Sequence, residues 1–320
     1  MRVVVPGGSG QVGTLLARAL HGEGHEVTVL SRRPAATPWS TRTWDGKTRG
    51  DWCAAIDGCD AVINLAGFSV DCRYNRRNRE RILNSRLDST RVVGEAIVDS
   101  AAPPPVWLQM STATIYAHRF DASNDEESGE IGGGEPGAPR SWDFSIEVAQ
   151  RWEQAALAAP TPETRKVLLR TAMVMSPDAG GIFDVLLGLT RRGLGGRSGS
   201  GRQFVSWIHG EDFVDAVRWL IDHREVRGVV NLAAPEPLPN GEFMAALRHA
   251  WGARWGLPAT AWMLEIGALI LRTETELVLK SRRVVPGRLL AEGFEFRYPN
   301  WPEAARELCR EWRRRRAQEA

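Results

Sequence analysis

The sequence predicts an α/β protein with a doubly wound parallel sheet, because strand-like and helix-like segments alternate through its first half. The first unit shows the pattern most clearly. Apolar residues 3–5 are typical of a buried strand, glycines follow within residues 7–13, and apolar residues then recur at helical spacing up to residue 20. A second strand at residues 27–30 completes this unit. With 320 residues and 43% hydrophobic content, the chain can bury a large core.

The glycines of the first turn predict a dinucleotide site. Gly7, Gly8, Gly10 and Gly13 fit both the Gly-x-Gly-x-x-Gly and the Gly-x-x-Gly-x-x-Gly spacings. The first two allow a tight turn, Gly10 lets the backbone approach a pyrophosphate, and Gly13 lets the helix pack closely on the strand. Free N–H groups at the start of the helix then face the phosphates. A strand–turn–helix unit without a ligand is the alternative.

The end of the second strand predicts which dinucleotide binds. An acidic residue there would bind the ribose hydroxyls and repel a 2′-phosphate, but this strand ends in Ser31, Arg32 and Arg33. Guanidinium groups match phosphate oxygens in a bidentate geometry, so the sequence favours NADP(H) over NAD(H). A solvated arginine loop is the alternative. The expected cofactor-binding residues are Gly7, Gly8, Ser9, Gly10, Gln11, Val12, Gly13, Ser31, Arg32, Arg33, Leu65, Ala66, Gly67, Arg86, Met110 and Thr171.

The alternation continues as far as residue 171. Strands are expected at residues 41–44, 60–66, 106–110 and 166–171, and helices at residues 75–100 and 142–159. The run Pro103–Pro105 ends the first of these helices, because proline cannot continue the hydrogen-bond ladder. The polar residues 119–141 are expected to form a surface loop.

A change of pattern after residue 171 predicts a domain boundary. A glycine-rich segment at residues 193–201 precedes a strand at 204–208 and a helix that starts near Glu211, and a largely helical tail follows from Pro258. Residues 1–171 are therefore expected to form a Rossmann-type NADP-binding domain. Residues 172–320 are expected to form a smaller, largely helical substrate-side domain, interleaved in space with the first.

Composition excludes several classes of partner. The net charge of +2 does not predict nucleic-acid binding, and the charged residues within 261–279 make this segment too polar to span a bilayer. The cysteines at 53, 59, 72 and 309 lack metal-ligand spacing, so no metal is expected.

The N-terminus is not typical of a signal peptide, and a cytoplasmic protein with a small-molecule substrate is expected. The run Arg313–Arg316 is interpreted as a solvated helix end. The oligomeric state stays open.

Longer motifs carry a family resemblance along nearly the whole chain. They are Gly7–Gly13, Ala61–Gly67, Ser85-Arg86, Trp152-Glu153, Gly199–Gln203, Ser206–His209 with Asp212, Ala233–Pro235, and Gly293–Pro299. Together they resemble the extended, atypical short-chain dehydrogenase/reductases. More narrowly, the chain is similar to the NAD-dependent epimerase/dehydratase-like subfamily that is often described as SulA-type cell-division-inhibitor homologues.

Enzymes of this superfamily normally transfer protons with a Tyr-x-x-x-Lys pair, and this chain has none. Its tyrosines, at 74, 116 and 298, are followed four residues later by Asn, Phe and Pro. The resemblance places the missing pair at Phe144 and Val148. It also places Thr112 where the superfamily has a Ser or Thr whose hydroxyl bonds a substrate oxygen. The run Thr114–Ala117 departs from the subfamily's Gly-Tyr-Tyr-Gly, which leaves its substrate contacts open.

Three residues are the catalytic candidates: Thr112, Tyr116 and His209. Tyr116 is either a general acid or a packed phenol, and His209 is either an acid near neutral pH or a helix cap. Arg86 either binds an anionic group of the substrate or pairs with an acidic residue of the long helix. Arg202 either binds such an anionic group or is solvated. The expected substrate contacts are Phe68, Phe144, Arg202 and Trp207.

Hydride transfer to or from a nicotinamide needs no side-chain base, because the cofactor carries the chemistry. The leading hypothesis is therefore an NADP(H)-dependent oxidoreductase or epimerase-like enzyme for a small carbonyl or hydroxyl compound, with an anionic one as an option. The alternative hypothesis is a non-redox regulator or scaffold that binds NADPH.

Overall fold

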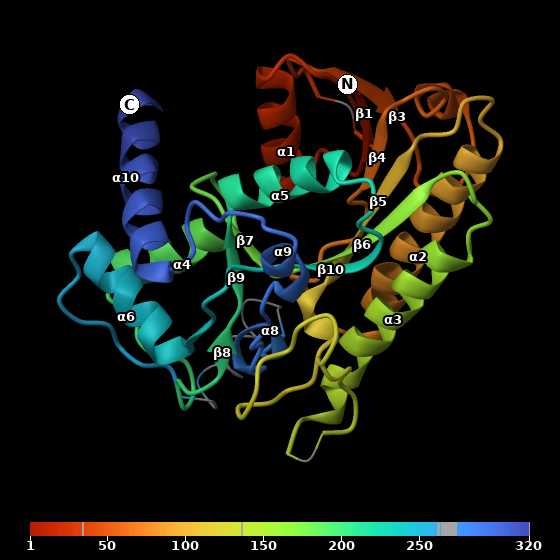
Figure 1. Cartoon of the computed structure of the whole chain (residues 1–320). Helices are drawn as coiled ribbons and strands as arrows, with labels where there is room; N and C mark the ends of the chain where they lie inside the picture. Colours follow the sequence, from red (N-terminus) through yellow and green to blue (C-terminus); the bar gives the residue numbers. More distant parts are fainter. Residues whose placement is uncertain (34, 136, 261–262, 264–273, 320) are drawn as a thin grey trace.

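Seven parallel strands form one central sheet in the computed structural model (Figure 1), which describes all residues except 34, 136, 261–262, 264–273 and 320. The strands are β1 (Arg2–Pro6), β2 (Glu26–Ser31), β3 (Ser40–Thr43), β4 (Ala61–Asn64), β5 (Val106–Thr112), β6 (Arg165–Thr171) and β10 (Gly228–Leu232). Their order is β10-β6-β5-β4-β1-β2-β3. The chain thus reverses direction across the sheet between β1 and β4, which is where doubly wound sheets bind ligands at their carboxyl edge.

Helices cover both faces of this sheet because its strands are apolar on both sides. Val3 and Val5 point to the face covered by α1 (Gln11–Gly22) and α5 (Gly210–Asp222). Val4, between them, points to the opposite face, which is covered by α2 (Arg76–Val98) and α3 (Asp143–Ala158). The expected Rossmann-type α/β fold is confirmed.

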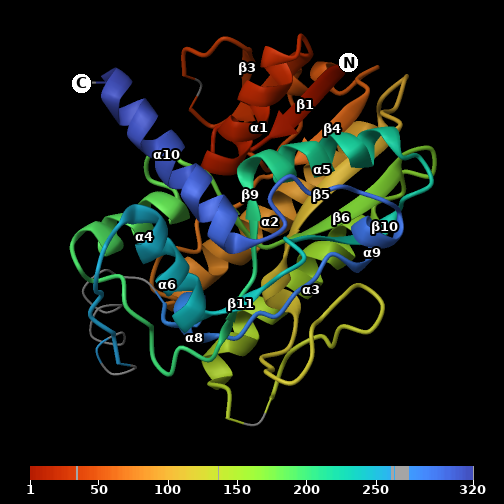
Figure 2. The same ribbon diagram turned by 60° about the vertical axis from the view of Figure 1, so that its left-hand side comes forward.

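The C-terminal half contributes to this sheet and also builds a second core. β10 and α5 belong to the sheet layers, although they follow residue 171. The helices α4 (Ile182–Arg191), α6 (Asn240–Trp251) and α10 (Trp301–Glu319) group beside the sheet, away from α2 and α3 (Figure 2). Two-stranded pairs lie between these parts: β7 (Met173–Met175) with β9 (Trp207–His209), and β8 (Phe204–Val205) with β11 (Leu238–Pro239).

Aromatic stacking fills the second core. The rings of Phe243 and Trp301 stack with centroids 4.0 Å apart, and Trp207 meets Trp301 edge-on at 5.0 Å. Trp207 is completely buried there. This packing argues against the expected contact between Trp207 and a substrate, which stays a prediction.

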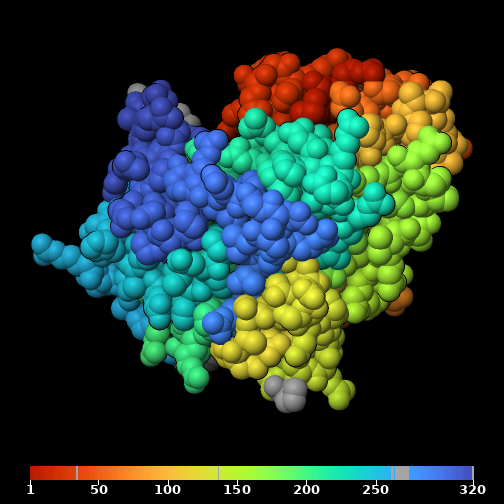
Figure 3. Space-filling model, in the orientation of Figure 1, coloured from red at the N-terminus to blue at the C-terminus, as the bar shows by residue number. Residues whose placement is uncertain are grey.

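The strand expected at 204–208 is divided at Ser206. The Ser206 hydroxyl donates to the carbonyl of Arg282 at 2.8 Å and accepts from the N–H of Val284 at 2.8 Å. Chain segment 276–285 therefore lies against the point where β8 ends and β9 begins. It contains the short helix α8 (Glu276–Leu279) and precedes α9 (Gly287–Ala291). On the face drawn in Figure 3, the loop at 119–135 (yellow) lies beside this C-terminal part of the chain (blue).

The close packing of α1 on the first turn gives a test of the fold. A Cβ atom added to Gly13 would overlap the backbone of Gly8, whereas one added to Gly22 would meet nothing within 4 Å. Gly13→Ala should lower the free energy of unfolding by about 3 kcal/mol or more, since backbone atoms cannot move aside cheaply. Gly22→Ala is the matched control and should be neutral or slightly stabilising. Denaturant unfolding of both variants measures the difference, and equal stabilities would contradict it.

Candidate functional site

The first turn presents unoccupied backbone donors at the switch point of the sheet. Gly10 is the N-cap of α1, and no side chain caps this helix end. A Cβ atom on Gly10 would have only the Gly7 carbonyl near it, at 3.6 Å, so this side of the turn is open. Uncapped N–H groups at a helix start attract anions. The turn can therefore take a pyrophosphate against its backbone.

The other glycines of the turn serve packing. Gly7 has a positive φ of 77°, and a Cβ atom there would lie 2.6 Å from the Cα of Ala66, just after β4. A Cβ atom on Gly8 would lie 2.8 Å from a methyl group of Val29. The turn consequently sits directly on the ends of β2 and β4, which brings Leu65, Ala66 and Gly67 beside it.

The end of β2 supplies two exposed guanidinium groups to the same edge. The Ser31 hydroxyl donates to Ser9 Oγ at 2.9 Å and accepts from the N–H of Arg33, so the glycine turn and the strand end are tied together. Arg32 and Arg33 are exposed, and within the described residues neither forms an ion pair. Their position fits a phosphate on the adenosine ribose of a dinucleotide held by the turn.

The remaining residues that were expected to contact the cofactor have few polar atoms free to do so. Gln11 reaches Gly181 at the start of α4, and Val12 and Met110 pack partly buried against the sheet core. The Thr171 hydroxyl donates to the carbonyl of Leu169 at 3.1 Å, and this residue is 9% exposed. These residues line the strand ends but offer few free polar atoms.

Arg86 is a deeply placed cation behind Gly67. Its guanidinium donates to the carbonyls of Phe68 and Ile82, both at 3.0 Å, and lies 4.8 Å from the ring centre of Trp152. Burial lowers the pKa of Arg86 to about 10. In the described part of the chain no carboxylate pairs with it, so the alternative of an ion pair within the long helix is wrong. A partly buried cation without a paired carboxylate is suited to an anionic ligand.

Thr112 keeps a free hydroxyl proton at the end of β5. Its Oγ1 accepts from the N–H of Thr114 at 3.2 Å, and the side chain is partly exposed. A hydroxyl can accept one hydrogen bond and donate another. Thr112 can therefore donate to a ligand oxygen at the carboxyl edge.

Tyr116 and His209 are engaged in structural contacts. The Tyr116 hydroxyl donates to Asn231 Oδ1 at 2.9 Å, and the residue is 1% exposed. His209 is 3% exposed; its Nδ1 accepts from the N–H of Glu211 and thereby caps α5, while Nε2 lies 2.9 Å from a carboxylate oxygen of Glu307. Burial raises the pKa of Tyr116. These contacts favour the packing and capping alternatives for the two residues.

Phe144 and Val148, which the resemblance places at the positions of the missing Tyr-Lys pair, are apolar and buried. They pack with Ile82 in a small cluster that includes Phe68 and Tyr74. The ring of Phe144 meets that of Tyr74 edge-on at 5.3 Å. The guanidinium of Arg81 lies 3.9 Å from the ring centre of Phe68.

Sequence reasoning missed a group of buried and partly buried polar residues next to these rings. We call Tyr74, Ser145, Glu276, Lys280 and Arg282 the junction cluster, because α3, α8 and the loop after β4 meet there. The Ser145 hydroxyl donates to Glu276 Oε2 at 2.6 Å. Lys280 Nζ donates to the carbonyl of Thr114 at 2.8 Å, and Arg282 Nε donates to the hydroxyl of the same threonine at 3.1 Å. The one available signal was the rarity of lysine, which occurs only at positions 47, 166 and 280.

Burial dominates the electrostatics of the junction cluster. It lowers the pKa of Lys280 to about 8, assisted by the nearby charge of Arg282, and it raises the pKa of Glu276. Burial also raises the pKa of Tyr74 to about 12. Strongly shifted groups at a strand edge are typical of functional sites, although structural networks also produce them.

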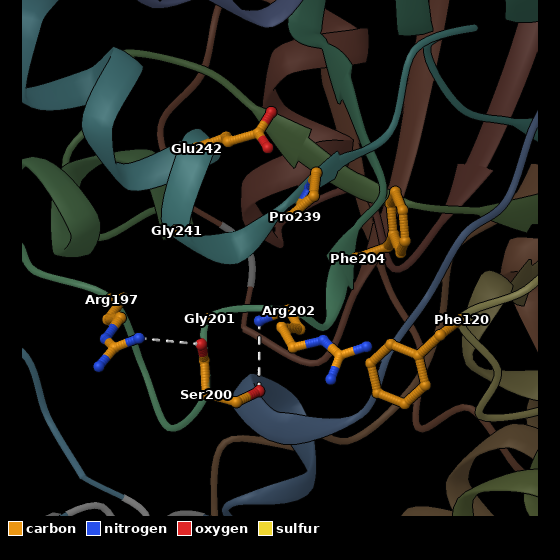
Figure 4. Close-up of a pocket in the computed structure, with 9 residues that line it drawn as sticks. All are labelled: Phe120, Arg197, Ser200, Gly201, Arg202, Phe204, Pro239, Gly241 and Glu242. Carbon is orange, nitrogen blue, oxygen red and sulfur yellow. Dashed lines mark hydrogen bonds between the residues drawn. The ribbon is translucent and has the colours of Figure 1, made fainter.

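A separate pocket of about 440 Å³ opens beyond this cluster (Figure 4). It is lined by Phe120, Arg197, Ser200, Gly201, Arg202, Phe204, Pro239, Gly241 and Glu242. The Arg202 side chain extends toward the Phe120 ring, and its backbone N–H donates to Ser200 Oγ at 3.2 Å. Thr112 does not line this pocket. Arg202 therefore lies in an outer pocket, and its role as a substrate contact stays a prediction.

None of the helices in the described residues is long and apolar enough to cross a lipid bilayer. Among the same residues, no group of three or more His, Cys, Asp or Glu side chains is arranged to hold a metal ion.

Comparison with known families matches most of the chain. Residues 3–233 match the model of the NAD dependent epimerase/dehydratase family. The chain belongs to this family. Residues 259–308 match a domain of unknown function, which includes α8 and the C-terminal members of the junction cluster.

Individual relatives agree with this assignment. The chain is 33% identical over 311 residues to the human epimerase family protein SDR39U1, covering 96% of this chain and 99% of the relative. A crystal structure of human SDR39U1 with NADPH has a TM-score of 0.84 and covers 97% of this chain and 99% of its own. A nucleoside-diphosphate sugar epimerase from Corynebacterium glutamicum, 28% identical, has a TM-score of 0.74 over 96% of this chain and 58% of its own. The narrower SulA-type description stays a prediction.

The lowered pKa of Lys280 predicts a pH dependence of stability. Below pH 8 the amine is charged in both folded and unfolded states, so the cost of burying the charge is fully present. Between about 8 and the usual value of 10.5 the folded state alone is deprotonated, so the free energy of unfolding should rise with pH, by about 1–3 kcal/mol. Lys280→Met should lose this rise, whereas Lys47→Met, at an exposed lysine, should keep it. Denaturant unfolding at several pH values measures it, and identical profiles for both variants would contradict the assignment.

Proposed function

We propose that this protein is an NADP(H)-dependent oxidoreductase or epimerase-like enzyme that acts on a small carbonyl or hydroxyl compound. The observation that carries the proposal is the uncapped start of α1 beside Arg32 and Arg33, at the switch point of the sheet. The NADPH in the crystal structure of human SDR39U1 supports the choice of cofactor. Gly10 and the first N–H groups of α1 would hold the pyrophosphate, and the two arginines would hold the 2′-phosphate.

The strand edge next to this cradle can support reduction of a carbonyl group. Bound NADPH supplies a hydride. Thr112 would donate its free hydroxyl proton in a hydrogen bond to the carbonyl oxygen, which stabilises the negative charge that develops there. A hydrogen-bonding hydroxyl of this kind supports an enzyme over a non-redox regulator or scaffold.

The charge of the surroundings supports an anionic substrate. Lys280 is buried near the carboxyl edge, and Arg86 and Arg282 are partly buried there. Glu276 faces Lys280 and Arg282, and Glu135 and Asp143 also face Lys280. Cations in such low-dielectric surroundings are stabilised when an anion binds. We therefore propose a small substrate that carries a carboxylate or a phosphate.

Exchange of one arginine tests the cofactor assignment. The wild-type protein should bind NADPH at least about tenfold more tightly than NADH, which corresponds to about 1.4 kcal/mol. Arg32→Asp should reduce or reverse this ratio, because a carboxylate repels the 2′-phosphate and accepts from ribose hydroxyls. Calorimetric titration with both cofactors measures the ratio. Arg42→Asp, an exposed position further along the chain, is the control, and equal wild-type affinities for both cofactors would contradict the proposal.

Removal of one hydroxyl tests the catalytic part. Thr112→Val keeps the shape of the side chain but cannot donate, so turnover should fall about a hundredfold or more while NADPH affinity stays the same. The assay follows NADPH oxidation with a panel of small carbonyl compounds, anionic ones included. Thr161→Val is the control, because that hydroxyl lies buried near the end of α3 without a hydrogen-bond partner. Full activity of Thr112→Val would remove this residue from the mechanism.

A further inference from the structure

Reduction of a carbonyl needs a proton at the oxygen as well as a hydride at the carbon. Phe144 and Val148 cannot provide one, since both side chains are hydrocarbons. The Tyr116 phenol is buried against Asn231, and His209 caps α5. The proton must therefore come from another group at the carboxyl edge of the sheet.

Tyr74 lies next to the position where the usual tyrosine is missing. It precedes α2 in the loop that follows β4, and its ring meets that of Phe144 edge-on at 5.3 Å. Its backbone N–H donates to Glu274 Oε1 at 2.6 Å, so the loop is also tied to the C-terminal half of the chain. The side chain is partly exposed, unlike that of Tyr116. Tyr74 thus combines a fixed position with access to the edge.

A chain of proton-carrying groups leads from Tyr74 into the interior. The Ser145 hydroxyl lies close enough to the Tyr74 phenol to lower its pKa. Ser145 Oγ in turn is 2.6 Å from Glu276 Oε2. The second carboxyl oxygen, Oε1, is buried and has no hydrogen-bond partner, in a residue that is 2% exposed. A buried oxygen without a partner is costly for a carboxylate and much less so for a carboxylic acid.

Burial favours the protonated forms of both ends of this chain, although the nearby cations favour the ionised forms. Glu276 faces Arg282, Lys280 and Glu274, and Tyr74 faces Glu276, Arg86 and Arg282. Burial outweighs these charges, so it raises the pKa of Glu276 and raises that of Tyr74 to about 12. At neutral pH the phenol is therefore protonated, as a proton donor must be.

We infer that Tyr74 is the proton donor to the substrate oxygen in place of the missing tyrosine, with Ser145 and Glu276 as a relay behind it. This inference rests on the proposed reductase function. As hydride reaches the carbonyl carbon, the C=O π bond breaks and its oxygen takes the phenolic proton of Tyr74. In the acid form, Glu276 Oε2 carries the proton and shares the 2.6 Å contact with Ser145 Oγ, which leaves the Ser145 proton free to turn to the phenol. The phenolate recovers that proton, and Ser145 Oγ takes the acid proton of Glu276. Overall, one NADPH and one proton are consumed for each alcohol formed.

Kinetics of single-hydroxyl variants test the donor. Tyr74→Phe should lower kcat about a hundredfold or more, with little change in KM or in NADPH affinity, because general-acid catalysis contributes on this scale. Tyr298→Phe, which removes a phenol from the ring stacked on His209, should keep wild-type rates. Thermal unfolding of each variant checks that the fold is kept.

The relay has readouts that a purely structural role would not move. Ser145→Ala should lower kcat, and Ser145→Thr, which keeps a hydroxyl, should restore much of it. Glu276→Gln should shift the pH dependence of kcat. Independently of turnover, infrared titration of the protein without substrate should show a protonated carboxyl band that persists above the usual carboxyl pKa of 4.5 and is lost in Glu276→Gln.

The outcomes separate this inference from the function on which it rests. If wild-type protein turns over and Thr112→Val does not, but Tyr74→Phe keeps wild-type kcat, the donor is overturned and the reductase stands. If the wild-type protein binds NADPH but oxidises it with no carbonyl compound, the proposed function fails and the donor role with it. If the carboxyl band titrates with exposed carboxylates, or Glu276→Gln leaves it unchanged, the relay is overturned whatever the turnover.

Discussion

The contacts that hold segment 276–285 against the end of β5 determine how the rest of the molecule is arranged. Lys280 donates to the Thr114 carbonyl and Arg282 to the Thr114 hydroxyl, directly after the strand that carries Thr112. The N–H of Ser281 donates to a ring nitrogen of His118, and the N–H of Val285 donates to the carbonyl of Asn124. Through these bonds the C-terminal half of the chain completes the edge at which the Rossmann-type sheet offers its ligand site.

This arrangement is unusual in the charges that it buries. Arg282 makes its hydrogen bonds to the carbonyls of residues 276, 277 and 280 and to the Thr114 hydroxyl. Glu276 is the carboxylate close to both Lys280 and Arg282, and one of its oxygens has no partner. Apolar residues would stabilise such a junction more simply, because burying ion pairs rarely adds stability. Proteins break local rules of this kind mainly at functional sites.

In the proposed function, the nucleotide cradle (the turn at Gly7–Gly13 with Arg32 and Arg33) would bind the cofactor, and the junction cluster would take part in catalysis. The cradle is built from backbone and glycine, so its shape follows directly from how the first turn packs on β2 and β4. The junction cluster is built from side chains of three separate segments, and its Tyr74 meets Phe144, where the family resemblance places the missing tyrosine. A fold shared by many enzymes thus leaves its chemistry to the loops and to the segments that close over them. The outer pocket with Arg202 is lined mainly by residues of the C-terminal half.

The sequence by itself determined the layered fold, the glycine turn and the arginines after β2, because these depend on neighbours in the chain. The alternation of Val3, Val4 and Val5 between two cores and the spacing of the glycines are local patterns. Only the tertiary structure decided the roles of Tyr116, His209 and Trp207, since their partners Asn231, Glu307 and Trp301 lie about a hundred residues away along the chain. It alone also brought Tyr74, Ser145 and Glu276 together. A periodic sequence pattern cannot predict a contact between residues so far apart in the chain. Such contacts form only when the whole chain folds and buries them, and the same burial causes their pKa shifts.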